Sequence, residues 1–260
     1  MSRPSKKVNT KFLRGSEIDN MDNVSFIKKA KKKPQNSFGQ FELKDIHPLT
    51  ENQGKVFSAY KEGKNVICSG FPGCGKTFLA LYLALYDVLY ADTDYERIVV
   101  IRSLVKTREI GHLPGSVEEK SAPFEAPYSA ICNELFHRGD AYSILKKKEI
   151  IEFENTSFLR GITFNNTIII VDEFENCNFH ELDTIAGRIG KNSKLVLCGD
   201  VNQTDLLSSN RDESGFKKFV KIASIMDNFE IVDFGVEDIV RSGFVYDYII
   251  AKNRVEQGYS

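Results

Sequence analysis

The segment at positions 70–77 limits what this chain can fold into more than any other feature. It reads GFPGCGKT and fits the pattern G-x-x-x-x-G-K-[ST]. The apolar run NVICS at 65–69 precedes it, and the helix-forming run FLALYLAL at 78–85 follows it. A buried strand, a glycine-rich loop and a helix in this order form a cradle for phosphate groups, because glycines let the backbone wrap closely around an anion. We therefore predict a nucleoside triphosphate site at this loop.

Each part of the loop has an expected role at such a site. Successive backbone N–H groups and the positive end of the helix would face the phosphates. Lys76 would reach the β and γ phosphates, and the Thr77 hydroxyl would bind Mg²⁺. A glycine-rich turn with a chance GKT is the alternative, but the flanking strand and helix favour a phosphate loop. The residues expected to bind the nucleotide are Gly70, Phe71, Pro72, Gly73, Cys74, Gly75, Lys76 and Thr77.

A second element of the same kind of site is an apolar run that ends in two acids. The run IIIV at 168–171 is followed by Asp172 and Glu173, the arrangement called Walker B. A parallel strand would place these carboxylates at the carboxyl edge of the sheet, beside the phosphate loop. Asp172 could then hold Mg²⁺, and Glu173 could orient or deprotonate a water that attacks the γ phosphate. An acidic turn after a strand is the alternative, and the phosphate loop makes it the weaker one.

A third block, GDVNQ at 199–203, follows the next apolar run. Gln203 could hydrogen-bond the γ phosphate or the attacking water, so that hydrolysis is reported to neighbouring elements. Gly-Asp turns are common, and the block gains weight only from its position after the Asp-Glu strand.

Two arginines are candidates for an arginine finger, which stabilises transition-state charge in the same chain or in a neighbouring one. Arg188 ends a predicted helix just before a glycine. Arg241 precedes the last predicted helix. For each arginine alone, a structural salt bridge is the competing explanation.

Apolar strand-like runs alternate with helix-like segments along the chain. This alternation predicts an α/β fold with a mostly parallel sheet and helices on both faces. The expected strands lie at 65–69, 98–101, 149–153, 167–171, 194–198 and 230–234. The expected helices lie at 51–61, 78–85, 127–138, 140–147, 179–189, 214–226 and 243–256, with a long connection at about 103–128. Thr50 is the expected N-cap of the first helix, and Gln53 has the spacing of a capping box.

The first part of the chain differs in composition from the rest. Residues 1–37 carry ten Lys and Arg against three Asp and Glu, a net charge of +7, whereas the whole chain has a net charge of −1. We expect residues 1–40 to form a flexible basic arm and residues 41–260 to form one folded domain. The lysine-rich run at 28–33 could bind RNA or single-stranded nucleic acid through its phosphates. A solvated tail is an equally good interpretation of a lysine run.

Composition also bears on the compartment. Five cysteines form no C-x-x-C pair, and Cys68 and Cys198 lie in apolar runs, which suits buried thiols in a reducing cytosol. No apolar run approaches the roughly 20 residues needed to span a bilayer, and the amino terminus lacks the apolar segment of a secretory signal. We expect a cytoplasmic protein without a membrane partner.

Four further blocks resemble the PhoH-like family, phosphate-starvation-inducible P-loop ATPases related to superfamily 1 helicases. The sharpest is GHLPG at 111–115, with Glu119-Lys120 and Pro123 downstream, which is similar to the family's GxLPG…K…P segment. The others are RGITF at 160–164, GD…Q.DL at 199–206 and DIVR at 238–241. The resemblance covers about residues 45–256.

The resemblance implies a single RecA-like domain that hydrolyses ATP, often forms a ring oligomer, with a hexamer as the candidate here, and works on RNA. It also implies that Gln53 contacts adenine. Three positions depart from the family pattern: Cys74 stands in place of Thr, Glu175 in place of Gln, and Ser242 in place of His. Small P-loop proteins of this kind occur in phages, in which case the compartment would be the host cytoplasm.

These observations together predict a Mg²⁺-dependent ATPase that uses ATP and assembles into a homo-oligomer. The catalytic candidates are Lys76, Glu173, Gln203, Arg188 and Arg241, and the metal ligands are Thr77 and Asp172. A small-molecule or nucleotide kinase, with the 103–128 connection as its lid, is one alternative. A nucleotide-dependent RNA-binding switch without significant turnover is the other.

Overall fold

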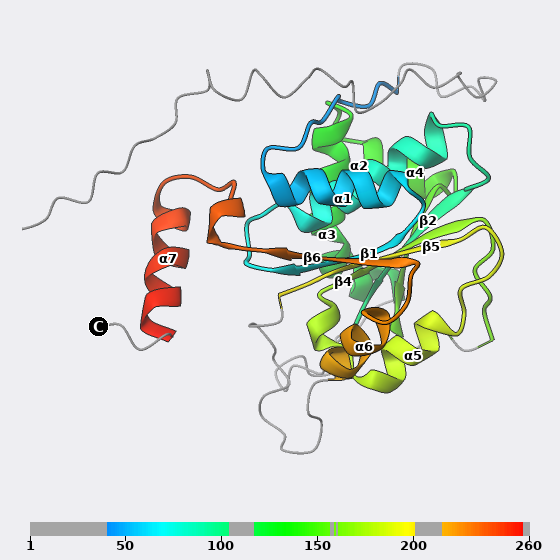
Figure 1. Cartoon of the computed structure of the whole chain (residues 1–260). Helices are drawn as coiled ribbons and strands as arrows, with labels where there is room; N and C mark the ends of the chain where they lie inside the picture. The colour runs from blue at the N-terminus through cyan, green and yellow to red at the C-terminus, as the bar shows by residue number, and fades with distance from the viewer. Residues whose placement is uncertain (1–40, 104–116, 157–158, 160, 201–214, 257–260) are drawn as a thin grey trace, which may run out of the picture.

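The computed structural model describes residues 41–103, 117–156, 159, 161–200 and 215–256, with the side chains of 117–121 and 256 left aside (Figure 1). Its strands form one sheet in the order β3-β2-β4-β5-β1-β6, and every neighbouring pair is parallel. The strands are β1 Asn65–Gly70, β2 Arg97–Arg102, β3 Ile151–Asn155, β4 Thr167–Asp172, β5 Lys194–Cys198 and β6 Phe229–Phe234. The helices are α1 Glu51–Lys61, α2 Lys76–Leu89, α3 Val117–Leu135, α4 Ala141–Lys147, α5 Phe179–Ala186, α6 Gly215–Ala223 and α7 Phe244–Glu256, with short 3₁₀ helices η2 Phe174–Asn176 and η4 Val236–Asp238.

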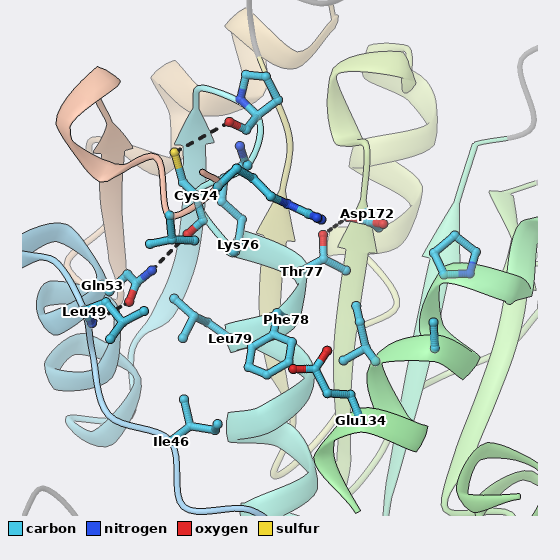
Figure 2. Close-up of a pocket in the computed structure, with 18 of the residues that line it drawn as sticks. Ile46, Leu49, Gln53, Cys74, Lys76, Thr77, Phe78, Leu79, Glu134 and Asp172 are labelled. Atoms are coloured by element: carbon cyan, nitrogen blue, oxygen red, sulfur yellow. Dashed lines mark hydrogen bonds between the residues drawn. The ribbon is translucent and has the colours of Figure 1, made fainter. Parts of the chain in front are cut away.

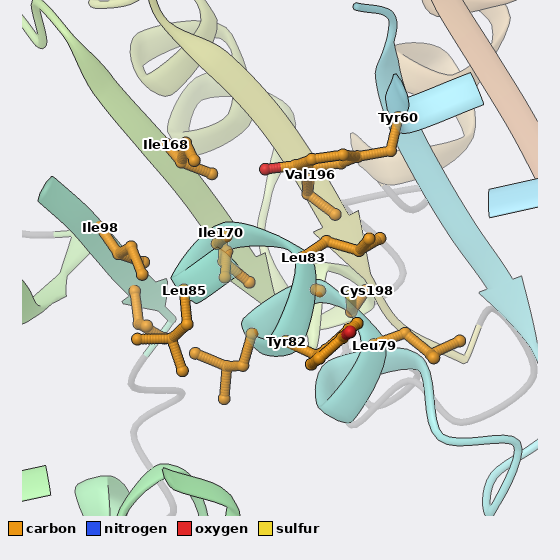
Figure 3. Packing of buried hydrophobic residues seen from close by; sticks show 14 of the residues in the cluster. Tyr60, Leu79, Tyr82, Leu83, Leu85, Ile98, Ile168, Ile170, Val196 and Cys198 are labelled. Carbon is orange, nitrogen blue, oxygen red and sulfur yellow. The ribbon is translucent and has the colours of Figure 1, made fainter. Parts of the chain in front are cut away.

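Helices cover both faces of the sheet, and the strand sequences show why. Every residue of β4 is buried, as expected of a strand with no solvent-facing side. Ile168 and Ile170 pack in the cluster under α1 to α4, whereas Ile169 and Val171 pack in the cluster under α5 and α6. Figure 3 shows the first cluster, in which side chains of α2 lie against β2, β4 and β5. The predicted RecA-like α/β fold is confirmed.

The predicted cap of the first helix is also confirmed. The Thr50 side chain accepts a hydrogen bond from the Gln53 backbone N–H, and α1 begins at the next residue, Glu51. The Gln53 side chain does not complete the capping box. It reaches the Leu49 N–H and the Cys74 carbonyl instead.

One predicted boundary is wrong in an informative way. The chain was expected to be a connection up to about residue 128, but α3 already begins at Val117 and includes Pro123 and Pro127. A proline removes a backbone hydrogen bond and normally breaks a helix. Both prolines are exposed, and the opposite face of α3 buries Tyr128, Cys132 and Leu135 at helical spacing. Burial of this apolar stripe outweighs the local cost.

Smaller differences have local causes. The third strand begins at Ile151 rather than 149, because Glu149 takes a left-handed conformation, with φ at 58°, and closes the turn after α4. The helix expected at 179–189 ends at Ala186, where Gly187 is the C-cap.

The parallel arrangement brings the carboxyl ends of all six strands to one edge. β1 and β6 end in register at Gly70 and Phe234, and β2 and β4 end in register at Arg102 and Asp172. Polar residues that are far apart in sequence therefore meet at this edge. Among the residues that the structure describes, no helix has the length and apolarity needed to cross a bilayer.

Gly70 is a point where the chain tolerates little change, and this can be measured. Its φ is +117°, and an added Cβ would overlap the Phe234 carbonyl oxygen and lie 2.7 Å from the Phe234 nitrogen. We predict that Gly70→Ala lowers the free energy of unfolding by about 3 kcal/mol in urea denaturation. Gly63→Ala is the control, because Gly63 also has a positive φ, +85°, but nothing within 4 Å of an added Cβ. It should cost about 1 kcal/mol, and equal losses would contradict the packing argument.

Candidate functional site

The glycine-rich loop leaves β1 and ends at Gly75, the N-cap of α2 (Figure 2). Gly73 and Gly75 have φ values of +80° and +77°, which a side chain would disfavour. The Lys76 ammonium group lies inside the loop, where it donates to the Gly70 carbonyl at 2.8 Å and to the Phe71 carbonyl at 2.6 Å. The loop therefore has the form that its sequence predicts, with a lysine charge at its centre.

The carboxylate of Asp172 joins three elements of the fold. One oxygen, Oδ1, accepts a hydrogen bond from the Thr77 hydroxyl at 2.7 Å, and Oδ2 accepts one from the Tyr128 hydroxyl at 2.9 Å. Asp172 is buried, and Tyr128 is fully buried. Burial first, and then the negative charge of Asp172, raise the pKa of Tyr128, so the phenol stays protonated as a donor.

Sequence reasoning missed Tyr128, because the residue lay at the margin of the predicted connection. The available signal was the spacing of Tyr128, Cys132 and Leu135, which is that of an apolar helix face. It identifies a buried face but gives no indication that the hydroxyl reaches a strand 44 residues away in sequence.

Glu173 follows Asp172 in a left-handed conformation, with φ at 50° and ψ at 46°. For a residue with a side chain this conformation is strained, and such strain is commonly found at functional sites. The Glu173 carboxylate forms an ion pair with Arg102 at the end of β2, and Arg102 is the more buried partner. Burial lowers the pKa of Arg102, but the adjacent Glu173 more than compensates and the pKa is raised overall.

The Arg102 partnership was not anticipated from the sequence. Arg102 directly follows a predicted strand and could have been any strand-end residue. The sheet register pairs Arg102 with Asp172, which places the guanidinium beside the next residue, Glu173. On its other side the guanidinium lies 5.9 Å from the centre of the Phe124 ring.

Glu175 occupies the position where the resemblance in sequence expects glutamine. Its side chain is buried against Gly199, at the end of β5, where an added Cβ would overlap its carboxyl oxygen. Burial raises the pKa of Glu175 to about 8, and the charges of Glu173 and Asp172 add to the effect despite opposing backbone hydrogen bonds. A protonated carboxyl has one O–H donor and a carbonyl acceptor, whereas a glutamine amide has two N–H donors and a carbonyl acceptor. The substitution therefore keeps a group that can both donate and accept at neutral pH.

One cavity of about 1020 Å³ lies beside these residues. Its polar end contains the loop, Asp172, Glu173 and Glu175. Its other end is mostly apolar, although Lys44, Asp45, His47 and Glu134 also line it, and it extends between α2, α3 and the segment before α1, as Figure 2 shows. The apolar side chains there are those of Ile46, Leu49, Phe78, Leu79 and Ile131.

Gln53 lies between the two ends of the cavity. Its Oε1 accepts from the Leu49 N–H at 2.7 Å, and its Nε2 donates to the Cys74 carbonyl at 3.1 Å. Gln53 therefore ties the phosphate loop to the apolar end. Cys74 is buried, and burial raises the pKa of its thiol to about 11, so it is a neutral packing group in the loop.

The two candidate arginines lie in different places. Arg241 lines the cavity of its own chain, its stem packs on Gly73, and the neighbouring Val240 N–H donates to the Gly73 carbonyl at 3.1 Å. Arg188 follows α5 at the opposite edge of the sheet, where its carbonyl accepts from Phe164 ahead of β4. The structure thus brings Arg241 to the loop and does not bring Arg188 there. Gln203, the segment at 111–115, Arg160 and the pair Asp205-Leu206 lie outside the described residues.

The buried carboxyl of Glu175 predicts a specific pH dependence of stability. Its pKa is raised in the folded protein, so its contribution is intact below the unfolded pKa of about 4.5 and is lost as the pH rises through about 8. We predict that Glu175→Gln becomes more stable relative to the unmodified protein as the pH rises from 5 to 8, by on the order of 3 kcal/mol in nucleotide-free urea unfolding. Glu62→Gln, at an exposed carboxylate, is the control. A stability difference that stays constant over this range would contradict the assignment.

The sequence is similar to a family of known proteins over most of its length. The PhoH-like protein family matches residues 45–252. PhoH-like proteins of Mycobacterium tuberculosis (strain H37Rv) and Bacillus subtilis (strain 168) are 31% identical over 217 residues and 29% identical over 259 residues. These alignments cover 82% and 93% of this chain, and 60% and 77% of the relatives. Protein PhoH of Escherichia coli K12 is 29% identical over 204 residues, which is 76% of this chain and 56% of that protein.

The chain spans about three fifths of the length of the mycobacterial and E. coli relatives. Among solved structures, the large terminase from a thermophilic bacteriophage in complex with ADP aligns with a TM-score of 0.45 and 13% identity, over 82% of this chain and 50% of that one. The family match, the loop around Lys76 and the strand ending at Asp172 agree, and the chain belongs to the PhoH-like family of P-loop NTPases.

Proposed function

We propose that this protein is a Mg²⁺-dependent ATPase whose hydrolysis is linked to RNA. The observation that carries the proposal is the 2.7 Å hydrogen bond between Thr77 and Asp172. It joins the end of the phosphate loop to the end of β4, two elements that a glycine-rich turn alone would not bring together. Such a junction is the metal-binding arrangement of P-loop NTPases.

The residues present suit Mg²⁺. Hydroxyl and carboxylate oxygens are the ligands that this hard cation prefers, and Thr77 Oγ1 and Asp172 Oδ1 lie next to each other at the loop. When bound, Mg²⁺ would neutralise phosphate charge. Tyr128 would orient Asp172 by holding its second oxygen. Lys76, now bonded to two loop carbonyls, would turn to the β and γ phosphates.

Glu173 is the proposed general base. It lines the cavity directly after Asp172, the proposed metal ligand, and its left-handed backbone conformation lies where β4 ends. Arg102 holds Glu173 through Oε2. We therefore assign Arg102 the role of positioning the base, with the second carboxylate oxygen accepting the proton of the attacking water.

Arg241 is the proposed arginine that stabilises transition-state charge within the same chain, because its stem already packs on the loop. Arg188 could serve only a neighbouring copy. Gln203 remains the proposed γ-phosphate sensor. Gln53 would hold the segment before α1, which would border the adenine ring. The apolar lining at this end of the cavity suits the apolar faces of adenine.

RNA enters the proposal through the basic arm and the family membership. Ten Lys and Arg at 1–37 would contact phosphates without sequence preference. We also propose a homo-oligomer. Arg188 lies away from the cavity of its own chain, so it could act in catalysis only at the site of a neighbouring copy.

The direct test is phosphate release from ATP, with and without single-stranded RNA. We predict that Glu173→Gln lowers kcat by about 10² to 10³-fold while the Kd of a non-hydrolysable ATP analogue changes by less than about threefold. Glu62→Gln, an exposed carboxylate away from the cavity, should leave both unchanged.

Phosphate release that appears only with an added alcohol or nucleotide acceptor would identify a kinase. Tight analogue binding without any release in the presence of RNA would identify a nucleotide-dependent switch. Either result would contradict the proposed ATPase.

A further inference from the structure

Residues 235–241, which we call the arginine segment, lead from the end of β6 to Arg241 along the phosphate loop. The Val240 N–H donates to the Gly73 carbonyl at 3.1 Å, and the stem of Arg241 packs on the same glycine. Arg241 is exposed and lines the nucleotide cavity. Where its guanidinium can reach therefore depends on where the backbone of the arginine segment is held.

The buried carboxyl group of Asp238 holds this segment. Asp238 is only 1% exposed. Its Oδ2 accepts a hydrogen bond from the Gly235 N–H at 2.9 Å, which closes the turn of η4. The same oxygen accepts from Asn52 Nδ2 at 2.7 Å, which joins the turn to α1. A buried acceptor that loses its donors costs free energy, so these two bonds keep the turn closed and fixed to α1.

Asn52, the second residue of α1, is itself oriented by its other contacts. Its Nδ2 also donates to the Asp233 carbonyl at 3.1 Å, and its Oδ1 accepts from Lys55 Nζ at 2.9 Å. The amide nitrogen therefore faces two acceptors, and the amide oxygen faces a donor. One turn further along, Val56 and Phe57 are buried in the core, so Asn52 projects from a helix that is fixed to the domain.

We propose that Asp238, held by Asn52, is a positioning residue that sets where Arg241 meets the transferred phosphoryl group. The proposal rests on the role given to Arg241 under the proposed function. Asp238 precedes Arg241 by three residues, and the Val240–Gly73 bond lies between them. The arginine stem is thus held from α1 and from the phosphate loop at once. Such control matters because a misplacement on the order of 1 Å can cost about 10²-fold in rate.

The next residue of α1 holds the other side of the loop. Gln53 Nε2 donates to the Cys74 carbonyl at 3.1 Å, while Asn52 Nδ2 donates to Asp238 (Figure 2 shows the Gln53 bond). Two neighbouring side chains of α1 therefore fix the loop and the arginine segment relative to each other before a nucleotide binds. Stabilisation of transition-state charge depends on such preorganised groups.

The test compares two dissociation constants of the full chain with Mg²⁺. One is for ADP–aluminium fluoride, which mimics the phosphoryl group in transfer, and the other is for a non-hydrolysable ATP analogue. We expect Arg241→Ala to weaken binding of the fluoride complex by about 10²-fold, because the arginine acts on transition-state charge. Asn52→Ala and Asp238→Ala should each weaken it by about three- to tenfold. Binding of the ATP analogue should change by less than about threefold in all three variants.

Two further variants serve as controls. Asp238→Asn keeps an oxygen that can accept both hydrogen bonds, so it should bind the fluoride complex as the unmodified protein does. Glu230→Ala removes an ion pair with Lys64 near the start of β6, away from Arg241, and should also leave binding of the fluoride complex unchanged.

Combined variants separate positioning from a general loss of structure. In an Arg241→Ala background, Asn52→Ala and Asp238→Ala should weaken the fluoride complex by less than about twofold more, because the group they position is absent. Losses that multiply, an Asp238→Asn variant as weak as Asp238→Ala, or an equal loss for the ATP analogue would each overturn the proposal. Circular dichroism verifies folding, and Asn52→Ala alone provides the same comparison if Asp238→Ala does not fold.

Phosphate release by the same proteins distinguishes this proposal from the proposed function. An unmodified protein that releases no phosphate but shows the expected binding pattern would contradict the ATPase and support the positioning role. An active protein in which only Arg241→Ala weakens the fluoride complex would contradict the positioning role alone. If Arg241→Ala has no effect, the role of Arg241 and the positioning role both fail.

Discussion

The rest of the site depends on the carboxylate of Asp172. Its two oxygens accept hydrogen bonds from Thr77 on α2 and Tyr128 on α3, at 2.7 and 2.9 Å, while its backbone ends β4. Three elements far apart in sequence are thereby held at fixed distance from the phosphate loop. Each bond has a charged acceptor and a neutral donor in a buried setting, where such bonds contribute about 1.5–3 kcal/mol.

Three carboxyl groups lie close together at this edge, and the structure keeps them compatible by three different means. Asp172 accepts two hydrogen bonds, Glu173 is paired with the Arg102 guanidinium, and burial keeps Glu175 protonated near neutral pH. Like charges in one cavity would otherwise repel one another and destabilise the fold. For the proposed ATPase, the arrangement would supply a metal-binding carboxylate, an oriented base and a neutral hydrogen-bonding group, which are three distinct chemical roles from the same functional group.

Sequence predicted what depends on local pattern, and the structure confirmed it: the loop after β1, the buried strand that ends at Asp172, the parallel sheet and the Thr50 cap. Prediction from sequence failed where packing between distant segments determines the structure. The early start of α3 needs the burial of Tyr128 to offset Pro123 and Pro127, and the Arg102–Glu173 pair needs the sheet register. Glu175 looked like a departure from a motif, and only its burial shows why a carboxyl can replace an amide there. The basic arm and Gln203 stay predictions, since they lie outside the described residues.

We propose that Tyr128 orients Asp172 as a metal ligand, and a Mg²⁺ titration is the most direct test. The measurement is the Mg²⁺ concentration for half-maximal binding of a non-hydrolysable ATP analogue, compared for Tyr128→Phe and Tyr142→Phe. Tyr142 is the matched control, because it is a buried tyrosine that donates to Glu125 at 2.8 Å, away from the cavity. We predict that Tyr128→Phe requires about three- to tenfold more Mg²⁺, from a loss of about 1 kcal/mol, and that Tyr142→Phe does not. Equal Mg²⁺ requirements for the two variants would contradict it.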